Sequence, residues 1–415
     1  MAGLVTYGGN DATDSMNKIW QQLAIATNWP VLVAVFVLSS LGLVSIWSDT
    51  PADGVRQLVF LGVAVLCMTL FQAVNYQRIG KLSWPFYVFS LLLVLYTVIG
   101  STRGGPDPIP FVHRVNGAYN WIKIGQIGVQ PAELVKLGFI LVLARYLRFR
   151  NNYRTFKGLL PPFGLALAPL VLILKQPDLG TALVFIPVLF AMLFVAGAKI
   201  KHLLAIVLMG AALAPVAWLA GKDEQTGQPF SRLPGFKYLP TLVKKYQRDR
   251  VNAMFTGEGD DAAMKKDSYQ VFRAMIALGS GGAAGKGPGN IPVGKHVPEA
   301  HTDMIFALIG EQFGFVGSAV VLGAYIVLFA AGIEISSATR EPFGKLIALG
   351  IVAMLAGQTF LNLMVATRLM PVTGVTLPFV SYGGSSLLAS YMAAGLLLNV
   401  GQNRPIVMAR EAFEF

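Results

Sequence analysis

The sequence is poor in charged residues and nearly devoid of cysteine. Only 13% of its 415 residues are charged, whereas 54% are hydrophobic, and the mean hydropathy is +0.60. This balance excludes an ordinary soluble domain and indicates a chain that crosses a membrane several times. The single cysteine, Cys67, lies within an apolar run and has no metal-ligand neighbours, so an internal disulfide and a cysteine-based metal site are excluded.

Three further patterns are missing. The first 28 residues are polar and lack the basic-then-apolar pattern of a cleaved signal peptide, so we expect the first apolar segment to act as the signal anchor. No internal repeat is visible, and the inverted-repeat signature of many secondary transporters is therefore absent. No basic-aromatic module stands clear of the apolar segments, so we expect no nucleic-acid partner despite the formal net charge of +12.

Apolar runs recur along the chain, separated by polar breaks. A helix needs about 20 predominantly apolar residues to cross the hydrocarbon core of a bilayer. The sequence therefore predicts an all-α polytopic membrane protein with about ten transmembrane helices. The predicted helices cover residues 29–47, 57–75, 84–100, 131–147, 159–174, 179–196, 203–220, 307–334, 346–366 and 386–400.

Basic residues gather in alternate breaks between these helices. By the positive-inside rule, the breaks that carry them face the cytoplasm, where they also contact anionic membrane lipid. Both termini are then cytoplasmic, and the long break between helices 7 and 8 faces outside. The basic residues on the cytoplasmic side are Arg78, Lys81, Arg145, Arg148, Arg150, Arg154, Lys157, Lys199, Lys201, Arg340, Lys345, Arg404 and Arg410.

The sequence indicates one transmembrane domain over residues 29–400, with a cytoplasmic N-terminal segment at 1–28 and a cytoplasmic tail at 401–415. A long extracytoplasmic loop, 221–302, interrupts the domain, and loops of this length are usually functional or disordered. It contains an apolar-periodic stretch that predicts an amphipathic helix over residues 269–278. A glycine-rich stretch follows over residues 279–289, which permits tight turns and close approach of backbone N–H groups to a ligand.

The most informative motif is PEAHTDMIF, residues 298–306, which places Asp303 where the long loop meets the eighth helix. A carboxylate at a membrane–water boundary can act on a substrate whose tail lies in lipid and whose head lies in water. An aspartate near a helix start can equally serve as an N-cap, because its oxygen accepts hydrogen bonds from unpaired backbone N–H groups.

Five blocks of the sequence, spread between Trp121 and Asn399, resemble the signature motifs of the SEDS family. These are the shape, elongation, division and sporulation proteins, RodA and FtsW among them. The blocks are PEAHTDMIF (298–306), QPAELVK (130–136), KQPDLGTAL (175–183), YQVFRAMIALGSGG (269–282) and LPFVSYGGSS (377–386).

The resemblance implies a ten-helix peptidoglycan glycosyltransferase of the bacterial cytoplasmic (inner) membrane, which polymerises lipid II into glycan strands. It implies a class B penicillin-binding protein as the partner that supplies transpeptidation. KQPDLGTAL and MPVTG (370–374) resemble the RodA, or elongation, branch, whereas PEAHTD resembles the FtsW, or division, branch. We favour the RodA-like reading. A lipid II flippase and a non-catalytic scaffold for the penicillin-binding protein remain the rival classes.

The resemblance also places the essential catalytic aspartate at Asp303. Glycan polymerisation needs a base that takes the proton of a sugar hydroxyl, and a carboxylate can do this when a partly apolar setting raises its pKa. His301 could tune that pKa, bind substrate or serve a structural role. One departure from the family pattern stands before Trp121, where Asn120 replaces the usual arginine.

Charged residues in and between the predicted helices are further candidates for substrate binding. Glu133 and Lys136 lie three apart on one face of the fourth helix and should pair or line a cavity, because isolated charges are costly in a membrane. Asp178 could cap the sixth helix. As a second carboxylate facing the cavity of Asp303, it could also help hold a divalent cation, Mg²⁺ or Mn²⁺, on a substrate pyrophosphate. No other cofactor is indicated.

Three more residues are candidates for binding the pyrophosphate. Arg248 belongs to a basic stretch of the long loop that is either a solvated charge run or an attractor for anions. Arg368 stands just beyond the ninth helix, where it could add a fixed positive charge. Ser381 belongs to a run of small residues before the last helix, which permits close packing or presents a helix N-terminus to a phosphate.

Overall fold

The computed structural model describes residues 28–103, 109–115, 118–125, 127–150, 154–222, 240–241, 243, 245–256 and 262–403. Helices dominate, and each of the ten predicted helices is present. These ten are α2 (Trp29–Asp49), α3 (Pro51–Ala73), α5 (Ser83–Arg103), α6 (Pro131–Arg148), α7 (Leu160–Lys175), α8 (Leu179–Ala196), α9 (Ile200–Leu219), α12 (Ile305–Ala338), α13 (Pro342–Ala366) and α14 (Gly384–Gln402).

Nine helices of the described chain are long and apolar enough to cross a membrane. The remaining predicted helix, α6, carries Glu133 and Lys136 near its start and two arginines in its last turn. Its side chains are nevertheless buried among the other helices over most of its length. The all-α polytopic prediction is therefore confirmed, because a helix ringed by protein can carry charges that a lipid-facing helix cannot.

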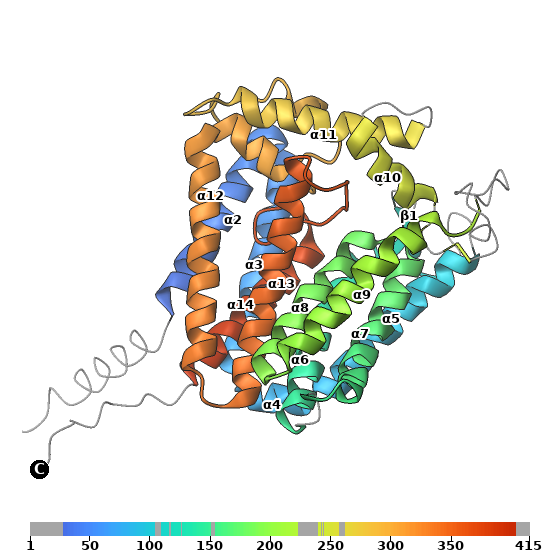
Figure 1. Ribbon diagram of the computed structural model, residues 1–415. Coiled ribbons are helices and arrows are strands. Elements are labelled where there is room, and N and C mark those ends of the chain that lie inside the picture. The colour runs from blue at the N-terminus through green and yellow to red at the C-terminus, as the bar shows by residue number, and fades with distance from the viewer. Residues whose placement is uncertain are drawn as a thin grey trace, which may run out of the picture.

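Successive helices of the bundle run in opposite directions, so their connections alternate between its two ends (Figure 1). One end, the basic end, carries the short helix α4 (Tyr76–Lys81) and the connections that follow α6, α8 and α12. The opposite end, the site end, is crossed by α11 (Ala262–Ser280) and reached by α10 (Lys245–Thr256) (Figure 1). Asn28 lies against Gly401, so both ends of the described chain meet at the basic end.

Helix α12 is broken near its start. Gly314 has φ 64° and ψ −156°, values that interrupt a right-handed helix and that glycine adopts without a steric penalty. The break separates residues 305–313, which lie beneath α11 at the site end, from residues 315–338, which run through the bundle (Figure 1). The sequence predicted one continuous helix here, because the apolar pattern continues through the break.

The site end also carries a small antiparallel sheet that the sequence did not predict. Its strands are β1 (Val112–Val115), β2 (Ala118–Ile124) and β3 (Ile127–Val129), in the order β1-β2-β3. Asn120, which departs from the family pattern, lies in β2. The hydroxyl of Ser385 at the start of α14 donates to the carbonyl of Gly128 in the last strand, which ties the sheet to the bundle.

Two predicted segments fall largely outside the described residues. They are the N-terminal segment 1–28 and the tail 401–415, together with Arg404 and Arg410. Within the long loop, the helix predicted over residues 269–278 is confirmed, since it forms part of α11.

Candidate active site

Asp303 lies in a tight turn directly before α12. Its backbone N–H donates to the carbonyl of Glu299 at 3.2 Å, and Glu299 itself has a positive φ of 53°. Met304, and not Asp303, occupies the N-cap position of α12, and it makes no side-chain cap hydrogen bond. The N-cap alternative is therefore wrong for Asp303, whose carboxylate instead forms a side-chain hydrogen bond with Thr302.

Segments distant in the sequence hold this turn in place. The side-chain amide of Asn362 in α13 donates to the carbonyl of Asp303 at 2.8 Å. The hydroxyl of Ser381 donates to the carbonyl of Thr302 at 2.6 Å, and the N–H of Tyr382 donates to the carbonyl of His301 at 2.8 Å. Each bond pairs a backbone carbonyl that would otherwise be left unsatisfied, so the turn has little freedom to move.

The electrostatic setting of Asp303 is unusual for an aspartate. Burial, repulsion by the Glu299 carboxylate and repulsion by the Asp178 carboxylate raise the pKa of Asp303 to about 7, although the guanidinium of Arg250 opposes them. A base works best when its pKa lies near the working pH, because it is then both deprotonated and able to hold a proton. The geometry therefore gives Asp303 the acidity that a general base requires.

Asp178 caps α8, as one of the two alternatives predicted. Its Oδ1 accepts from the Thr181 N–H at 3.0 Å, and its Oδ2 accepts from the Thr181 hydroxyl at 2.9 Å and from the side-chain amide of Gln130 at 3.1 Å. Burial raises the pKa of Asp178, and repulsion by Glu133 adds to the rise. Its charge also acts on Asp303, whereas its place in a shared substrate cavity stays a prediction.

The loop between α13 and α14 packs against the Asp303 carboxylate and against the first turn of α8. Gly374 lies so close to Asp303 that a Cβ added there would be 3.7 Å from Oδ2 of that residue. The carbonyl of Thr373 packs on Gly180 in the first turn of α8. Arg250 of α10 donates to the carbonyl of Val372 at 3.1 Å, which brings its charge to the same place.

Glu133 and Lys136 pair directly in α6. Their Oε1 and Nζ atoms lie 2.8 Å apart, and the two residues are only 6% and 3% exposed. Both charges influence Asp178, which places the pair on the side of α6 that faces the site. The structure thus places Glu133 and Lys136 of α6 close enough to act on Asp178, and Asp178 close enough to act on Asp303 in the turn before α12.

Three other predicted residues bond to the protein's own groups. The guanidinium of Arg248 is buried and donates to the carbonyls of Val243, Trp218 and Ala220, where it caps the end of α9. Arg368 donates to the carbonyl of Met254 at 3.2 Å.

The third, His301, lies next to α2, and its Nε2 is 2.8 Å from a carboxylate oxygen of Asp49. These contacts give the three residues roles in holding the site together, and their contact with substrate stays a prediction.

The described residues contain no group of three histidine, cysteine or acidic side chains placed to hold a metal ion. Both oxygens of Asp178 already accept hydrogen bonds, and Asp303 stands apart as the candidate base. The described residues therefore do not form a metal centre of their own, and any divalent cation in the chemistry below would arrive with the substrate.

Sequence reasoning missed several residues that shape the site. Gln130 and Asn362 act through side-chain amides whose roles depend on partners far away in the sequence. Gln130 lies within the family block QPAELVK. Asn362 lies in an apolar helix, and a polar residue in a predicted membrane segment could have marked it as a candidate. Arg250 was grouped with a basic run, and only the fold shows that its charge reaches Asp303.

Comparison with known proteins identifies the family. The model of the FtsW/RodA/SpoVE family, described as "Cell cycle protein", matches residues 18–405. The chain belongs to this family. The match covers most of the chain, and it includes every element that builds the site around Asp303.

Individual family members are similar along nearly their whole length. Stage V sporulation protein E of Bacillus subtilis (strain 168) is 33% identical over 389 residues, which cover 90% of this chain and 96% of that protein. The peptidoglycan glycosyltransferase RodA of Treponema pallidum (strain Nichols) is 29% identical over 431 residues, with 89% and 96% covered.

The fold of the chain is also represented among solved structures. One described as "Structural coordination of polymerization and crosslinking by a peptidoglycan synthase complex" matches with a TM-score of 0.73 and 32% identity. The match covers 92% of this chain and 99% of that one.

Proposed function

We propose that the chain is a peptidoglycan glycosyltransferase that polymerises lipid II in the bacterial cytoplasmic membrane. The observation that carries the proposal is the half-buried Asp303 carboxylate, whose pKa lies near 7 at the site end of a membrane bundle. Family relatives that bear the name peptidoglycan glycosyltransferase support the substrate class. The site end then faces outside, and both termini lie in the cytoplasm with the basic end.

In the proposed reaction, two lipid-linked disaccharides meet at the site end. Asp303 takes the proton of the acceptor's sugar hydroxyl, and that oxygen attacks the anomeric carbon of the donor. The new glycosidic C–O bond forms as the bond to undecaprenyl pyrophosphate breaks, so the configuration at the anomeric carbon inverts. The proton remains on Asp303 until solvent removes it.

Charges around the site would assist the departure of the pyrophosphate. Arg250 lies close enough to affect Asp303 and supplies a positive charge at the same place. Such fixed charges stabilise developing negative charge without reorganising during the reaction. The pyrophosphate would carry Mg²⁺ or Mn²⁺ with it, since Mg²⁺ in proteins is often bound by one or two carboxylates together with substrate phosphates.

We further propose a class B penicillin-binding protein as the partner and cell-wall elongation as the setting. Similarity to the subunit of a peptidoglycan synthase complex supports the partner. The motifs KQPDLGTAL and MPVTG support the elongation branch. Identities of 33% to the sporulation protein and 29% to RodA do not separate the branches, so the division branch remains the alternative.

The deciding experiment is polymerisation of labelled lipid II by the purified protein, with and without the penicillin-binding protein. Wild type should give long glycan products, and Asp303→Asn should lose activity by at least about 10²-fold while remaining folded, with a melting temperature no lower than that of wild type. Lys295→Met, at an exposed position of the same loop, is the matched control. Absence of product from wild type, even with partner and divalent cation, would refute the proposal. Equal product from wild type and Asp303→Asn would remove Asp303 as the base.

A further inference from the structure

Glu311 is a fully buried acid that the proposed reaction does not use. It lies in the short first part of α12, before the break at Gly314. A charge in such a position is costly unless it is paired and hydrogen-bonded. The hydrogen bonds of Glu311 therefore show which segments of the chain this residue joins.

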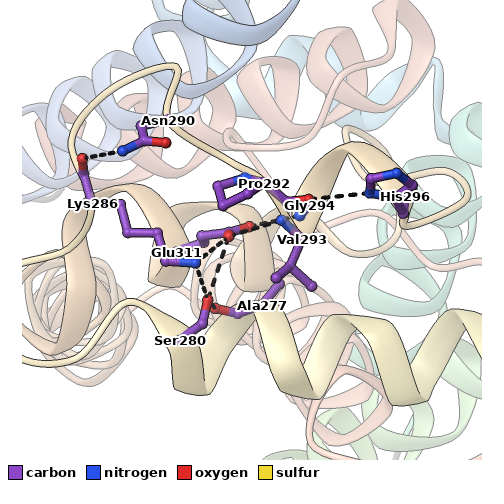
Figure 2. Close-up of polar contacts among 9 residues, drawn as sticks. All are labelled: Ala277, Ser280, Lys286, Asn290, Pro292, Val293, Gly294, His296 and Glu311. Atoms are coloured by element: carbon purple, nitrogen blue, oxygen red, sulfur yellow. Dashed lines mark hydrogen bonds and ion pairs between the residues drawn. The ribbon is translucent and has the colours of Figure 1, made fainter.

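Both carboxylate oxygens of Glu311 are occupied. Oε1 accepts from Lys286 Nζ at 2.7 Å, from the Val293 N–H at 3.1 Å and from the Ser280 hydroxyl at 3.4 Å, whereas Oε2 accepts from the Gly294 N–H at 2.6 Å. Figure 2 shows the carboxylate between the Lys286 side chain and the backbone of Val293 and Gly294, with Ser280 beside it. One side chain thus joins the end of α11, the glycine-rich stretch and the short 3₁₀ turn at Gly294–His296.

The backbone reinforces this junction on both sides of the break in α12. The N–H groups of Lys286 and Gly287 donate to the carbonyls of Glu311 and Gln312, each at 2.9 Å. In the other direction, the N–H of Phe315 donates to the carbonyl of Gly282 at 2.8 Å. The break leaves backbone groups of α12 without helical partners, and the glycine-rich stretch supplies those partners.

Close packing against α12 requires glycine at two positions of this stretch. A side chain at Gly281 would overlap the carbonyl of Gly310, and one at Gly285, which has a positive φ of 82°, would overlap the carbonyl of Gln312. At these two positions the missing side chain lets the backbone of α12 approach closely. The long loop is therefore anchored to the bundle immediately before the chain reaches the catalytic turn.

The chain runs from Gly294 through residues 295–302 to Asp303, with no helix longer than one turn in between. One end of this segment is fixed by Glu311, and the other by Asn362 and Ser381. A segment held at both ends keeps its intermediate turn in one place. If the Glu311 end were released, the Asp303 turn would be held by the bundle alone.

We propose that Glu311 and Lys286 are a positioning pair for the proposed polymerase, whose buried contact holds the long loop so that Asp303 meets the acceptor hydroxyl. The pair touches no reacting atom. Its effect is on the placement and hydration of the base, and the proposal rests on the function proposed above.

The test compares Glu311→Gln, Lys286→Met and Lys286→Arg in the full-length protein, with Lys295→Met as the matched control. Lys295 is a solvent-exposed lysine in the same loop. Backbone hydrogen exchange over residues 283–297 reports the anchor directly, and lipid II polymerisation gives kcat, KM and the pH profile.

Glu311→Gln and Lys286→Met should speed exchange over residues 286–294 and lower kcat by about 10- to 100-fold, because small misplacements of a reacting group cost this much. KM should change by less than about 2-fold, since the substrate-binding surface is intact. The acidic limb of the pH profile should move to lower pH as water reaches Asp303. Lys286→Arg should restore most of kcat, and Lys295→Met should match wild type.

Two results would overturn the positioning role. One is unchanged exchange in both neutralising variants. The other is faster exchange with wild-type kcat and pH profile.

If Glu311→Gln fails to fold, Lys286→Met carries the same test, because the lysine is partly exposed and its loss leaves Glu311 bonded to two N–H groups. An inactive wild type would refute the proposed function and the positioning role together, whereas an active wild type with unaffected variants refutes the positioning role alone.

Discussion

The side-chain amide of Asn362 donates to the backbone carbonyl of Asp303 at 2.8 Å and to the carbonyl of Val375 at 2.8 Å. One residue of α13 thereby joins the turn that carries Asp303 to the loop that packs against the same carboxylate. Asn362 is almost fully buried, and its bond to the Val375 carbonyl is buried too, whereas its bond to the Asp303 carbonyl is part-buried. The position of the candidate base depends on this amide as much as on its own neighbours.

Asn362→Leu should lower both stability and activity. It leaves the buried Val375 carbonyl and the part-buried Asp303 carbonyl unpaired, and an unsatisfied buried group costs about 1–3 kcal/mol. The melting temperature and the polymerisation rate are the measurements. Thr367→Ala, which removes only a local hydroxyl bond at the exposed end of the same helix, should leave both unchanged. A wild-type rate in Asn362→Leu would show that the turn is held by its other bonds.

The polymerisation rate should rise with pH around a midpoint near 7. Asp303 acts as a base only when deprotonated, and its pKa is raised to about 7. The measurement is kcat/KM from pH 5 to pH 9, which reports the free enzyme. A rate that is flat between pH 5.5 and pH 8 would contradict Asp303 as the titrating group.

The raised pKa of Asp303 should also make the stability of the folded protein depend on pH. The folded state holds the Asp303 proton up to pH 7, whereas the unfolded state releases it near pH 4, so this residue makes folding less favourable as pH rises between those values. Asp303→Asn cannot ionise. It should therefore melt at a higher temperature than wild type at pH 8 and at a similar temperature at pH 4, and the reverse order at pH 8 would contradict the raised pKa.

Asp178→Asn should move the acidic limb of the pH profile to lower pH. The carboxylate of Asp178 repels that of Asp303, so its loss lowers the pKa of the base. Asparagine keeps an oxygen that can cap α8, whereas Asp178→Ala should also lose about 1 kcal/mol of helix capping. Comparing the two variants separates the charge from the cap. An unmoved limb in Asp178→Asn would mean that the two carboxylates do not interact.

Breaking the Glu133–Lys136 pair should destabilise the bundle strongly. Removing one member of a buried ion pair typically costs about 3–5 kcal/mol, because the other charge is left buried alone. Glu133→Gln and Lys136→Met should therefore lower the melting temperature sharply, and the double variant should recover much of the loss. The exposed pair Asp53–Arg56, also three residues apart, is the matched control, and Arg56→Met should change stability by less than about 0.5 kcal/mol.

Chelation of divalent cations should slow polymerisation, and Mg²⁺ or Mn²⁺ should restore it. The cation would travel with the pyrophosphate, and Asp178 would attract it through charge. Asp178→Asn should then need several-fold more cation for half the maximal rate. Full activity of wild type in a chelator would remove the cation from the proposal.

The helices were predictable because the bilayer imposes a simple rule on the chain. Runs such as residues 179–196 must be apolar over the thickness of the membrane, and this requirement is visible without any knowledge of packing. The break at Gly314 was not predictable from that rule, since the apolar pattern continues through it. The reason for the break is a partner, the glycine-rich stretch, which reaches it from another part of the chain.

In the site, too, the sequence predicts some features and only the packing decides others. The motif around Asp303 and the spacing of Glu133 and Lys136 named the residues with unusual chemistry, because charges near a membrane are costly and stand out. The basic run that contains Arg248 does not predict whether this arginine binds an anion or caps α9, because an arginine suits both roles. The structure shows that it donates hydrogen bonds to the carbonyls of Trp218 and Ala220 at the end of α9.

The sequence by itself determined the membrane class, the ten long helices and their order, the family and the aspartate on which the proposed chemistry depends. Those features follow from local composition and short motifs. Only the tertiary structure decided that Asp178 and Arg250 act on Asp303, that Asn362 holds it, and that Glu311 anchors the loop before it. Hydrogen bonds and charges act over a few ångströms in space, and the residues that come within that range are chosen by the packing of the bundle.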